Sequence, residues 1–131
     1  MSVVDSTMSR TKALPAAGAS ANFDSVDLGA DRVGHLGERL TIHVKIPALP
    51  ALVEDKTVIH KLQDSADDST FADVLELSGA TVTGASGDGA AAKEFRFFFP
   101  PDTRRYVRLV STVLASGGDN TGVSTTLEFR V

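Results

Sequence analysis

The sequence predicts an all-β protein built as an antiparallel sandwich or barrel. Six or seven short segments alternate apolar and polar residues or concentrate β-branched and aromatic residues, which is typical of strands. Turn-forming residues separate these segments along the chain, and no segment shows a convincing helical period. Many short strands between such turns favour a sandwich or a barrel over the other fold classes.

The composition fits one folded domain. The chain has 131 residues, of which 42% are hydrophobic, so it has enough apolar surface to offset chain entropy. A net charge of −4 disfavours direct nucleic-acid binding by the surface as a whole. The absence of cysteine excludes disulfides, thiolate metal sites and cysteine nucleophiles. Because no apolar run is long enough to span a membrane and residues 1–12 lack the apolar core of a signal peptide, we expect no membrane association.

Residues 1–21 differ from the rest of the chain. They are rich in Ser, Thr, Ala and Gly and show no sustained hydrophobic period. We therefore expect an extended N-terminal arm over residues 1–21, followed by a sandwich domain over residues 22–131. Three interpretations of the arm remain open: a frayed terminus, an arm that orders on a neighbouring subunit, or a short strand of the same domain.

The clearest strand covers residues 38–46, ERLTIHVKI. Its apolar residues alternate with polar ones, which is typical of a strand with one buried face. The inward set is Leu40, Ile42, Val44 and Ile46, and the outward set is Arg39, Thr41, His43 and Lys45. The alternation therefore predicts that His43 is solvated. Pro47 and Pro50 end the strand and open a loop.

Further strands are expected in the middle of the chain. A second strand covers residues 57–63, and residues 73–84 form one longer strand or two short ones around Gly79. On the second strand Val58, His60 and Leu62 share one face and Ile59 and Lys61 the other. A glycine-rich loop follows at residues 84–92.

The segment KEFRFFF, residues 93–99, is the most aromatic part of the chain. Alternation places Phe95, Phe97 and Phe99 on one face, where we expect them in the core, each contributing about 1.5–3 kcal/mol. Phe98 falls on the other face, so it must lie in an interface, under a loop or on an exposed patch. The residues that follow, at positions 100–103, form a corner of the chain.

Two strands are expected near the C-terminus, over residues 106–115 and 123–131. The first has apolar residues on both parities, as in a central strand covered on both sides. The second directs Leu127, Phe129 and Val131 inward. Residues 116–122, SGGDNTG, form the turn between them.

Residues that could carry catalysis or bind a transition metal are few. His35, His43 and His60 are the three histidines, and no two of them have a metal-ligand spacing. His60 is interpreted as a satisfied residue of the core or its boundary. The glycine-rich segments match no dinucleotide-binding or P-loop pattern, and no nucleophile elbow is present. The sequence therefore predicts no enzyme activity, no catalytic residue, no metal and no cofactor.

A cluster of carboxylates lies in QDSADDSTF, residues 63–71, and just beyond it. Asp64, Asp67, Asp68 and Asp73 could bind a cation through their oxygens, although their spacing does not fit an EF-hand loop. The alternative is a loop in which side-chain oxygens cap backbone N–H groups.

Arg104, Arg105 and Arg108 form the one notable cationic group in the sequence. They could form surface salt bridges with the abundant carboxylates, each worth about 0–1 kcal/mol. They could equally contact an acidic partner surface. With Phe98 and the arm they make a candidate interface. Its residues are Phe98, Arg104, Arg105, Arg108, Arg10, Lys12 and Leu14.

Three segments follow one another in an order known from one family: VDLGADR (26–32), LQDSADDSTF (62–71) and RRYVRL (104–109), the last before a Gly/Asn hairpin. With the N-terminal arm they resemble the jelly-roll cement, or decoration, proteins of tailed-bacteriophage capsids, the group typified by a Bordetella phage cement protein. The resemblance covers about residues 22–131. The corner PPDTRR (100–105) and the loop PALPALVED (47–55) depart from the family pattern.

The resemblance implies a jelly-roll sandwich with a structural role on the outer surface of a virion. Proteins of this family bind the expanded head lattice, bridge major capsid protein subunits and resist the pressure of packaged DNA. It also implies synthesis in the host cytoplasm and a homo-oligomer, with a dimer favoured over a trimer.

Two other functions remain as alternatives. A glycan- or surface-binding sandwich module would use exposed Trp or Tyr side chains for stacking, and the chain has only Tyr106. An enzyme of the cupin kind would need a histidine-rich metal cluster on its strands, which three scattered histidines do not suggest.

Overall fold

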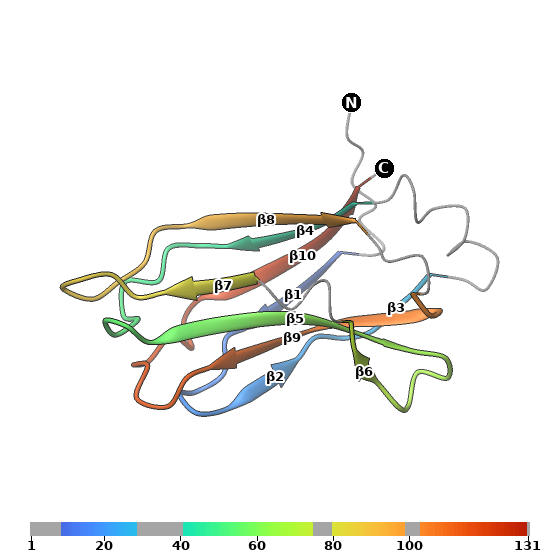
Figure 1. Cartoon of the computed structure of the whole chain (residues 1–131), viewed down its shortest axis with the longest axis horizontal. Helices are drawn as coiled ribbons and strands as arrows, with labels where there is room; N and C mark the ends of the chain where they lie inside the picture. The colour runs from blue at the N-terminus through green and yellow to red at the C-terminus, as the bar shows by residue number, and fades with distance from the viewer. Residues whose placement is uncertain (1–8, 29–40, 75–79, 99–102, 131) are drawn as a thin grey trace.

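A computed structural model of the chain describes residues 9–28, 41–74, 80–98 and 103–130 (Figure 1). Every regular element among these residues is a β-strand. The strands are β1 Arg10–Ala13, β2 Ser20–Asn22, β3 Val26–Asp27, β4 Thr41–Ile46, β5 Thr57–Ser65, β6 Ala72–Asp73, β7 Ala80–Thr83, β8 Lys93–Phe98, β9 Tyr106–Val113 and β10 Ser124–Arg130. The prediction of an all-β protein is therefore confirmed.

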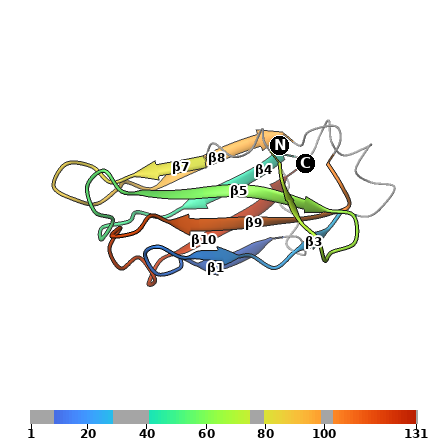
Figure 2. The ribbon, with the colours of Figure 1, turned by 60° about the horizontal axis from the view of Figure 1, so that its bottom comes forward.

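The strands form two antiparallel sheets that pack face to face (Figures 1 and 2). The first sheet has the order β1-β10-β4-β8. The second has the order β2-β9-β5-β6, with β3 also pairing with β9 and β7 with β5. Side chains alternate between the two faces of each sheet, so one face of each meets the other sheet and one faces outward.

The pairing of the strands is nested. The early strand β1 pairs with the late strand β10, β2 and β3 pair with β9, β4 pairs with β8, and β5 pairs with β7. A long hairpin folded over itself into two sheets gives this arrangement, which is the jelly roll. The predicted jelly-roll-like antiparallel sandwich is thus the observed architecture.

The described part of residues 1–21 belongs to the sandwich. Residues 10–13 pair with β10, and the segment from Ser20 onward pairs with β9. Leu14, between them, is 2% exposed and its backbone nitrogen donates to the carbonyl of Val123 at 2.9 Å. The expectation of a separate arm is therefore wrong for residues 10–21, and the interpretation as a strand of the same domain is correct. Residues 1–8 lie outside the described residues.

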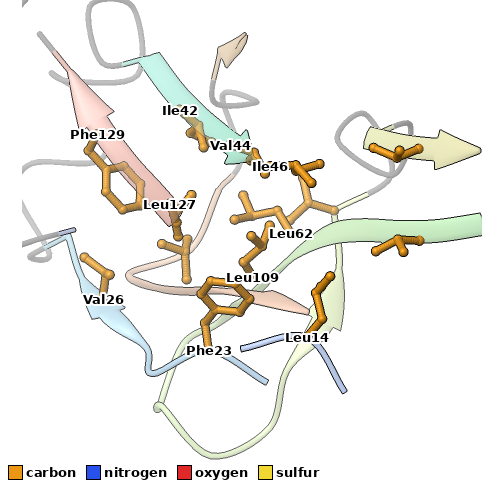
Figure 3. Packing of buried hydrophobic residues seen from close by; sticks show 14 of the residues in the cluster. Leu14, Phe23, Val26, Ile42, Val44, Ile46, Leu62, Leu109, Leu127 and Phe129 are labelled. Atoms are coloured by element: carbon orange, nitrogen blue, oxygen red, sulfur yellow. The ribbon is translucent and has the colours of Figure 1, made fainter. Parts of the chain in front are cut away.

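The core lies between the inner faces of the two sheets (Figure 3). From the first sheet, alternate residues of β4 and β10 point inward, and those of β5 and β9 meet them from the second. These inward residues include Ile42, Val44, Ile46, Leu127 and Phe129 on one side and Val58, Leu62, Leu109 and Val113 on the other. The inward sets predicted for residues 41–46 and 124–129 are confirmed, and on residues 57–63 the face shared by Val58, His60 and Leu62 is the buried one.

Three burial predictions need correction. His43 is only 6% exposed although it points away from the core, because neighbouring side chains cover it. Phe95 and Phe97 point inward but are only half-buried, because β8 is an edge strand. Strand β9 was expected to be covered on both faces, but only its inner face is fully covered. Just beyond its end, Leu114 is 44% exposed.

Three loops hold one end of the sandwich together through backbone hydrogen bonds. The nitrogen of Val53 donates to the carbonyl of Gly117 at 3.1 Å, and that of Asp55 donates to the carbonyl of Gly84 at 3.1 Å. A Cβ atom on Gly84 would lie 2.2 Å from the carbonyl oxygen of Val53, so only glycine fits there without a backbone shift. The loops after β4, β7 and β9 therefore form one tightly packed end.

Several predictions fall outside the described residues. These are the structures of residues 38–40, 75–79 and 99–102, the environment of His35, and the inward direction of Val131.

Candidate functional site

Three arginines at or just before the start of β9 contact three different partners. Arg104 is bound to Asp64 at the end of β5: its backbone nitrogen donates to Oδ2 at 3.0 Å, and its Nε and Nη2 donate to Oδ1 at 3.0 and 2.8 Å. These hydrogen bonds to the carboxylate raise the pKa of Arg104. Arg104, two residues before β9, is thereby tied to the end of β5.

Arg105 pairs with Asp27 of β3. Its Nε and Nη2 donate to the two carboxylate oxygens at 2.7 and 2.8 Å, which is the bidentate geometry of an arginine and a carboxylate. The same guanidinium lies 5.1 Å from the ring centroid of Tyr106. The hydrogen bonds from Arg105 to Asp27 are the main cause of its raised pKa.

Arg108 lies on the outer face of the second sheet. Its guanidinium carbon is 4.0 Å from the ring centroid of Phe71, within the range of a cation–π contact. Its Nε donates to Oε1 of Gln63 at 2.9 Å, and Gln63 in turn donates to Asp73 at 2.9 Å. The bond from Gln63 is the main cause of the lowered pKa of Asp73, which Lys61 also contacts at 3.3 Å.

Each of the three arginines therefore has a partner within the chain, and the salt-bridge interpretation holds for two of them. The side chains of Arg104 and Arg105 are nevertheless 41% and 43% exposed. Their contact with another protein remains a proposal, in which they would act as fixed rather than freely rotating groups.

The other candidate interface residues occupy different environments. Phe98 is 64% exposed at the end of β8, and Lys12 is exposed on β1, the opposite edge of the same sheet. Arg10 crosses to the second sheet, where its Nη2 donates to the carbonyl of Ser25 at 3.3 Å. Leu14 is part of the core, so its predicted role as a contact residue is wrong. It sits where β1 gives way to a turn, and its burial could not be read from a segment with no hydrophobic period.

The carboxylate cluster at residues 64–68 is engaged by the protein itself. Asp64 binds Arg104, and Oδ1 of Asp67 accepts hydrogen bonds from the backbone nitrogens of Ser69 and Thr70, both at 3.0 Å. These bonds, that of Thr70 first, lower the pKa of Asp67 to about 2. The described residues hold no group of three side chains suited to a metal ion. The loop fits the capping interpretation.

The two described histidines belong to different sheets and have different surroundings. His43, on β4, has Nδ1 3.0 Å from Oε1 of Glu94 and Nε2 3.0 Å from Oγ1 of Thr41. His60, on β5, is fully buried between the sheets with Nε2 3.1 Å from Oγ1 of Thr125. Each histidine therefore contacts a threonine hydroxyl, His43 on the outer face of the first sheet and His60 inside the core.

His60 is a polar group inside the apolar core. Its burial lowers the pKa to about 4, with only a small opposing effect from the backbone of Ala80. Nδ1 of His60 and Oγ of Ser111, its cross-strand neighbour, have no partner of good hydrogen-bond geometry among the described residues. The prediction that His60 is a core residue is confirmed. The sequence did not indicate that Nδ1 of His60 and Oγ of Ser111 would lack hydrogen-bond partners.

Two hollows in the described part of the chain differ in their lining. One is a shallow depression at the ends of β4 and β8, lined by Lys45, Ile46, Pro47, Ala92, Lys93 and Glu94. Another is a small apolar void beneath Phe97. The depression carries the charged side chains of Lys45, Lys93 and Glu94, whereas the void is lined by apolar residues. Among the described residues no helix could cross a membrane.

Comparison with known proteins supports the fold. No protein-family model and no curated protein sequence matches the chain. Among solved structures it is similar to the VP2 subviral particle of infectious bursal disease virus, with a TM-score of 0.50 and 14% sequence identity. The match covers 100% of this chain and 32% of the VP2 chain, so the chain spans about a third of that protein. At this identity the likeness shows a shared fold and nothing about function.

Proposed function

We propose that this chain is a capsid cement, or decoration, protein of a tailed bacteriophage. It would bind the outer surface of the expanded head lattice and stabilise it by bridging major capsid protein subunits. The observation that carries the proposal is the jelly roll, in which the strands from β1 to β10 pair in a nested order within two antiparallel sheets. The whole of this chain resembles about a third of the VP2 chain in fold. The order of its sequence segments supports the same family.

The surface of the protein is consistent with a structural role. The described residues contain no metal-ligand group, and several of their titratable side chains have structural partners: Asp64 binds Arg104, Asp67 caps a loop, and His60 lies in the core. A protein of this function needs a rigid body with fixed surface groups. The linked loops at one end and the Arg104–Asp64 clamp near the other supply that rigidity.

Exposed residues at the edges of the first sheet would make the contacts. Phe98 is the most exposed large apolar side chain in the described part of the chain, and Lys12 is exposed at the opposite edge. A homo-oligomer, with a dimer favoured over a trimer, would engage several lattice sites at once. Many weak sites acting together give an avidity that one site lacks.

The test is cosedimentation of the purified protein with expanded heads stripped of decoration, from the phage that encodes it. Unexpanded proheads are the control. Saturable pelleting at a fixed ratio to capsid subunits, on expanded heads only, is the expected result. Expanded heads carrying the protein should also lose less DNA on heating than stripped heads.

Absence of pelleting on expanded heads would refute the cement function and leave the glycan-binding module as the alternative. The structure gives that alternative little support, because the guanidinium of Arg105 already lies over the ring of Tyr106. Stacking of a sugar on that face would require displacement of an arginine held by two hydrogen bonds to Asp27.

A further inference from the structure

Strand β8 is the longest edge strand in the described part of the chain. It ends the order of the first sheet, β4 is its one partner among the described strands, and it is the uppermost labelled strand in Figure 1. It runs for six residues, whereas the other edge strands, β1, β2, β3, β6 and β7, run for two to four. Proteins usually keep edge strands short because their unpaired N–H and C=O groups pair readily with another chain.

The two faces of β8 differ in chemistry. Phe95 and Phe97 point toward the core but are half-buried, and their rings stack with centroids 6.4 Å apart. Arg96 and Phe98 point outward and are exposed. A strand added beside β8 would direct alternate residues over Phe95 and Phe97 and the intervening ones toward Arg96.

The charge along β8 favours an acidic segment. Lys93 and Arg96 are exposed, and neither has an ion pair among the described residues. Glu94 lies on the same outward face as Arg96, is about half exposed and has Oε1 3.0 Å from Nδ1 of His43. With this carboxylate counted, the charged side chains of β8 still carry a net positive charge, although the whole chain carries −4. An acidic partner would be attracted here and repelled by the rest of the surface.

We propose that β8 is a docking strand for an extended acidic segment of a partner protein. The segment would join the first sheet as a fifth strand next to β8, with main-chain hydrogen bonds supplying affinity and side chains supplying specificity. It would alternate apolar residues over Phe95 and Phe97 with acidic residues beside Arg96. The view of this partner as a capsid subunit rests on the proposed function, whereas the mode of binding does not.

The test uses a synthetic, end-blocked peptide that alternates valine and glutamate, titrated into the isotope-labelled full chain and followed by NMR. We expect saturable shifts centred on the amides of residues 93–98 and slower hydrogen exchange at the open side of β8. A peptide alternating valine and lysine should bind at least about tenfold more weakly. Arg96→Glu should weaken binding of the glutamate peptide by a similar factor.

Lys56→Glu is the matched control, since it makes the same charge change in the loop before β5 and should leave binding unchanged. Arg96→Lys should retain most of the binding, and melting curves of the variants should match because Arg96 is exposed. The inference is overturned if the glutamate peptide gives no shifts, if the lysine peptide binds equally, or if the shifts centre on another strand.

The two proposals fail separately. If the peptide binds β8 but the chain does not pellet with expanded heads, the docking strand stands and the cement function is wrong. If the chain and its Arg96→Glu variant pellet equally with expanded heads and no peptide binds, the cement function stands and the docking strand is wrong.

Discussion

The carboxylate of Asp64 accepts hydrogen bonds from both the backbone nitrogen and the guanidinium of Arg104. The three distances lie between 2.8 and 3.0 Å, and the pair joins the end of β5 to the residues that lead into β9. Asp64 is 9% exposed, so this acceptor is largely withdrawn from water.

The first prediction concerns this pair. Asp64→Ala should lower the free energy of unfolding by about 2 kcal/mol, because it leaves partly buried donors of Arg104 without an acceptor. Asp27→Ala, which removes the exposed partner of Arg105, should cost clearly less. Urea denaturation of the two variants measures both losses, and equal losses would contradict the structural role given to Asp64.

The second prediction concerns pH. Burial lowers the pKa of His60 to about 4, so between pH 6.5 and 4 the unfolded chain binds a proton that the folded chain does not. The free energy of unfolding should therefore be constant above about pH 7 and fall by about 3 kcal/mol by pH 4. Denaturant titrations across this range measure the slope.

His60→Gln is the control for the pH effect. It should lower the stability at pH 7 but remove most of the slope between pH 6.5 and 4. The contribution of Asp67, whose pKa is about 2, is lost only as the pH falls below about 4, so the two windows separate. A slope that persists in the variant would show that another group causes it.

The third prediction concerns the packed end of the sandwich. Gly84→Ala should lower the free energy of unfolding by more than about 2 kcal/mol, because the new Cβ meets the carbonyl oxygen of Val53 at 2.2 Å. Gly122→Ala has open space around it and should change stability by less than about 0.5 kcal/mol. Thermal unfolding of both variants gives the comparison, and a tolerated Gly84→Ala would mean that the loops move apart easily.

The fourth prediction concerns Phe98. Phe98→Ser should leave the melting temperature unchanged, because the side chain is 64% exposed, and should weaken binding to expanded heads about tenfold. Cosedimentation over a range of concentrations measures the affinity. Leu114→Ser removes an exposed apolar side chain just beyond the end of β9 and should leave the affinity for expanded heads unaltered. Equal losses in both variants would indicate nonspecific hydrophobic adsorption.

The sequence reveals those strands whose burial is one-sided. Residues 41–46 alternate because one face meets the other sheet, and that periodicity is visible without a structure. On residues 57–63 the sequence shows which residues share a face, but the buried face is known only from the structure. Residues 10–13 carry no such pattern, because β1 is an edge strand with exposed side chains. The segment therefore looks like an unstructured arm, although it pairs in register with β10.

The partners of the candidate site depend on register, which the sequence does not determine. His43 lies between Arg96 of β8 and Glu128 of β10 and contacts Glu94, and these neighbours follow from the strand pairing. Arg105 forms its ion pair with Asp27, which is 78 residues earlier in the sequence. The sequence shows that the three arginines lie close together along the chain. It does not show which side chains they bind, because those partners come from distant strands.

The place of β10 between β1 and β4 has a consequence for how the chain folds. The last described strand enters the interior of its sheet, so β1 and β4 have no neighbour on those sides until β10 arrives. Topologies dominated by such distant pairings fold slowly, in milliseconds to seconds. During synthesis the sandwich can close only after the ribosome has released β10, and until then the apolar faces of β4 and β5 depend on transient contacts or on chaperones for protection from aggregation.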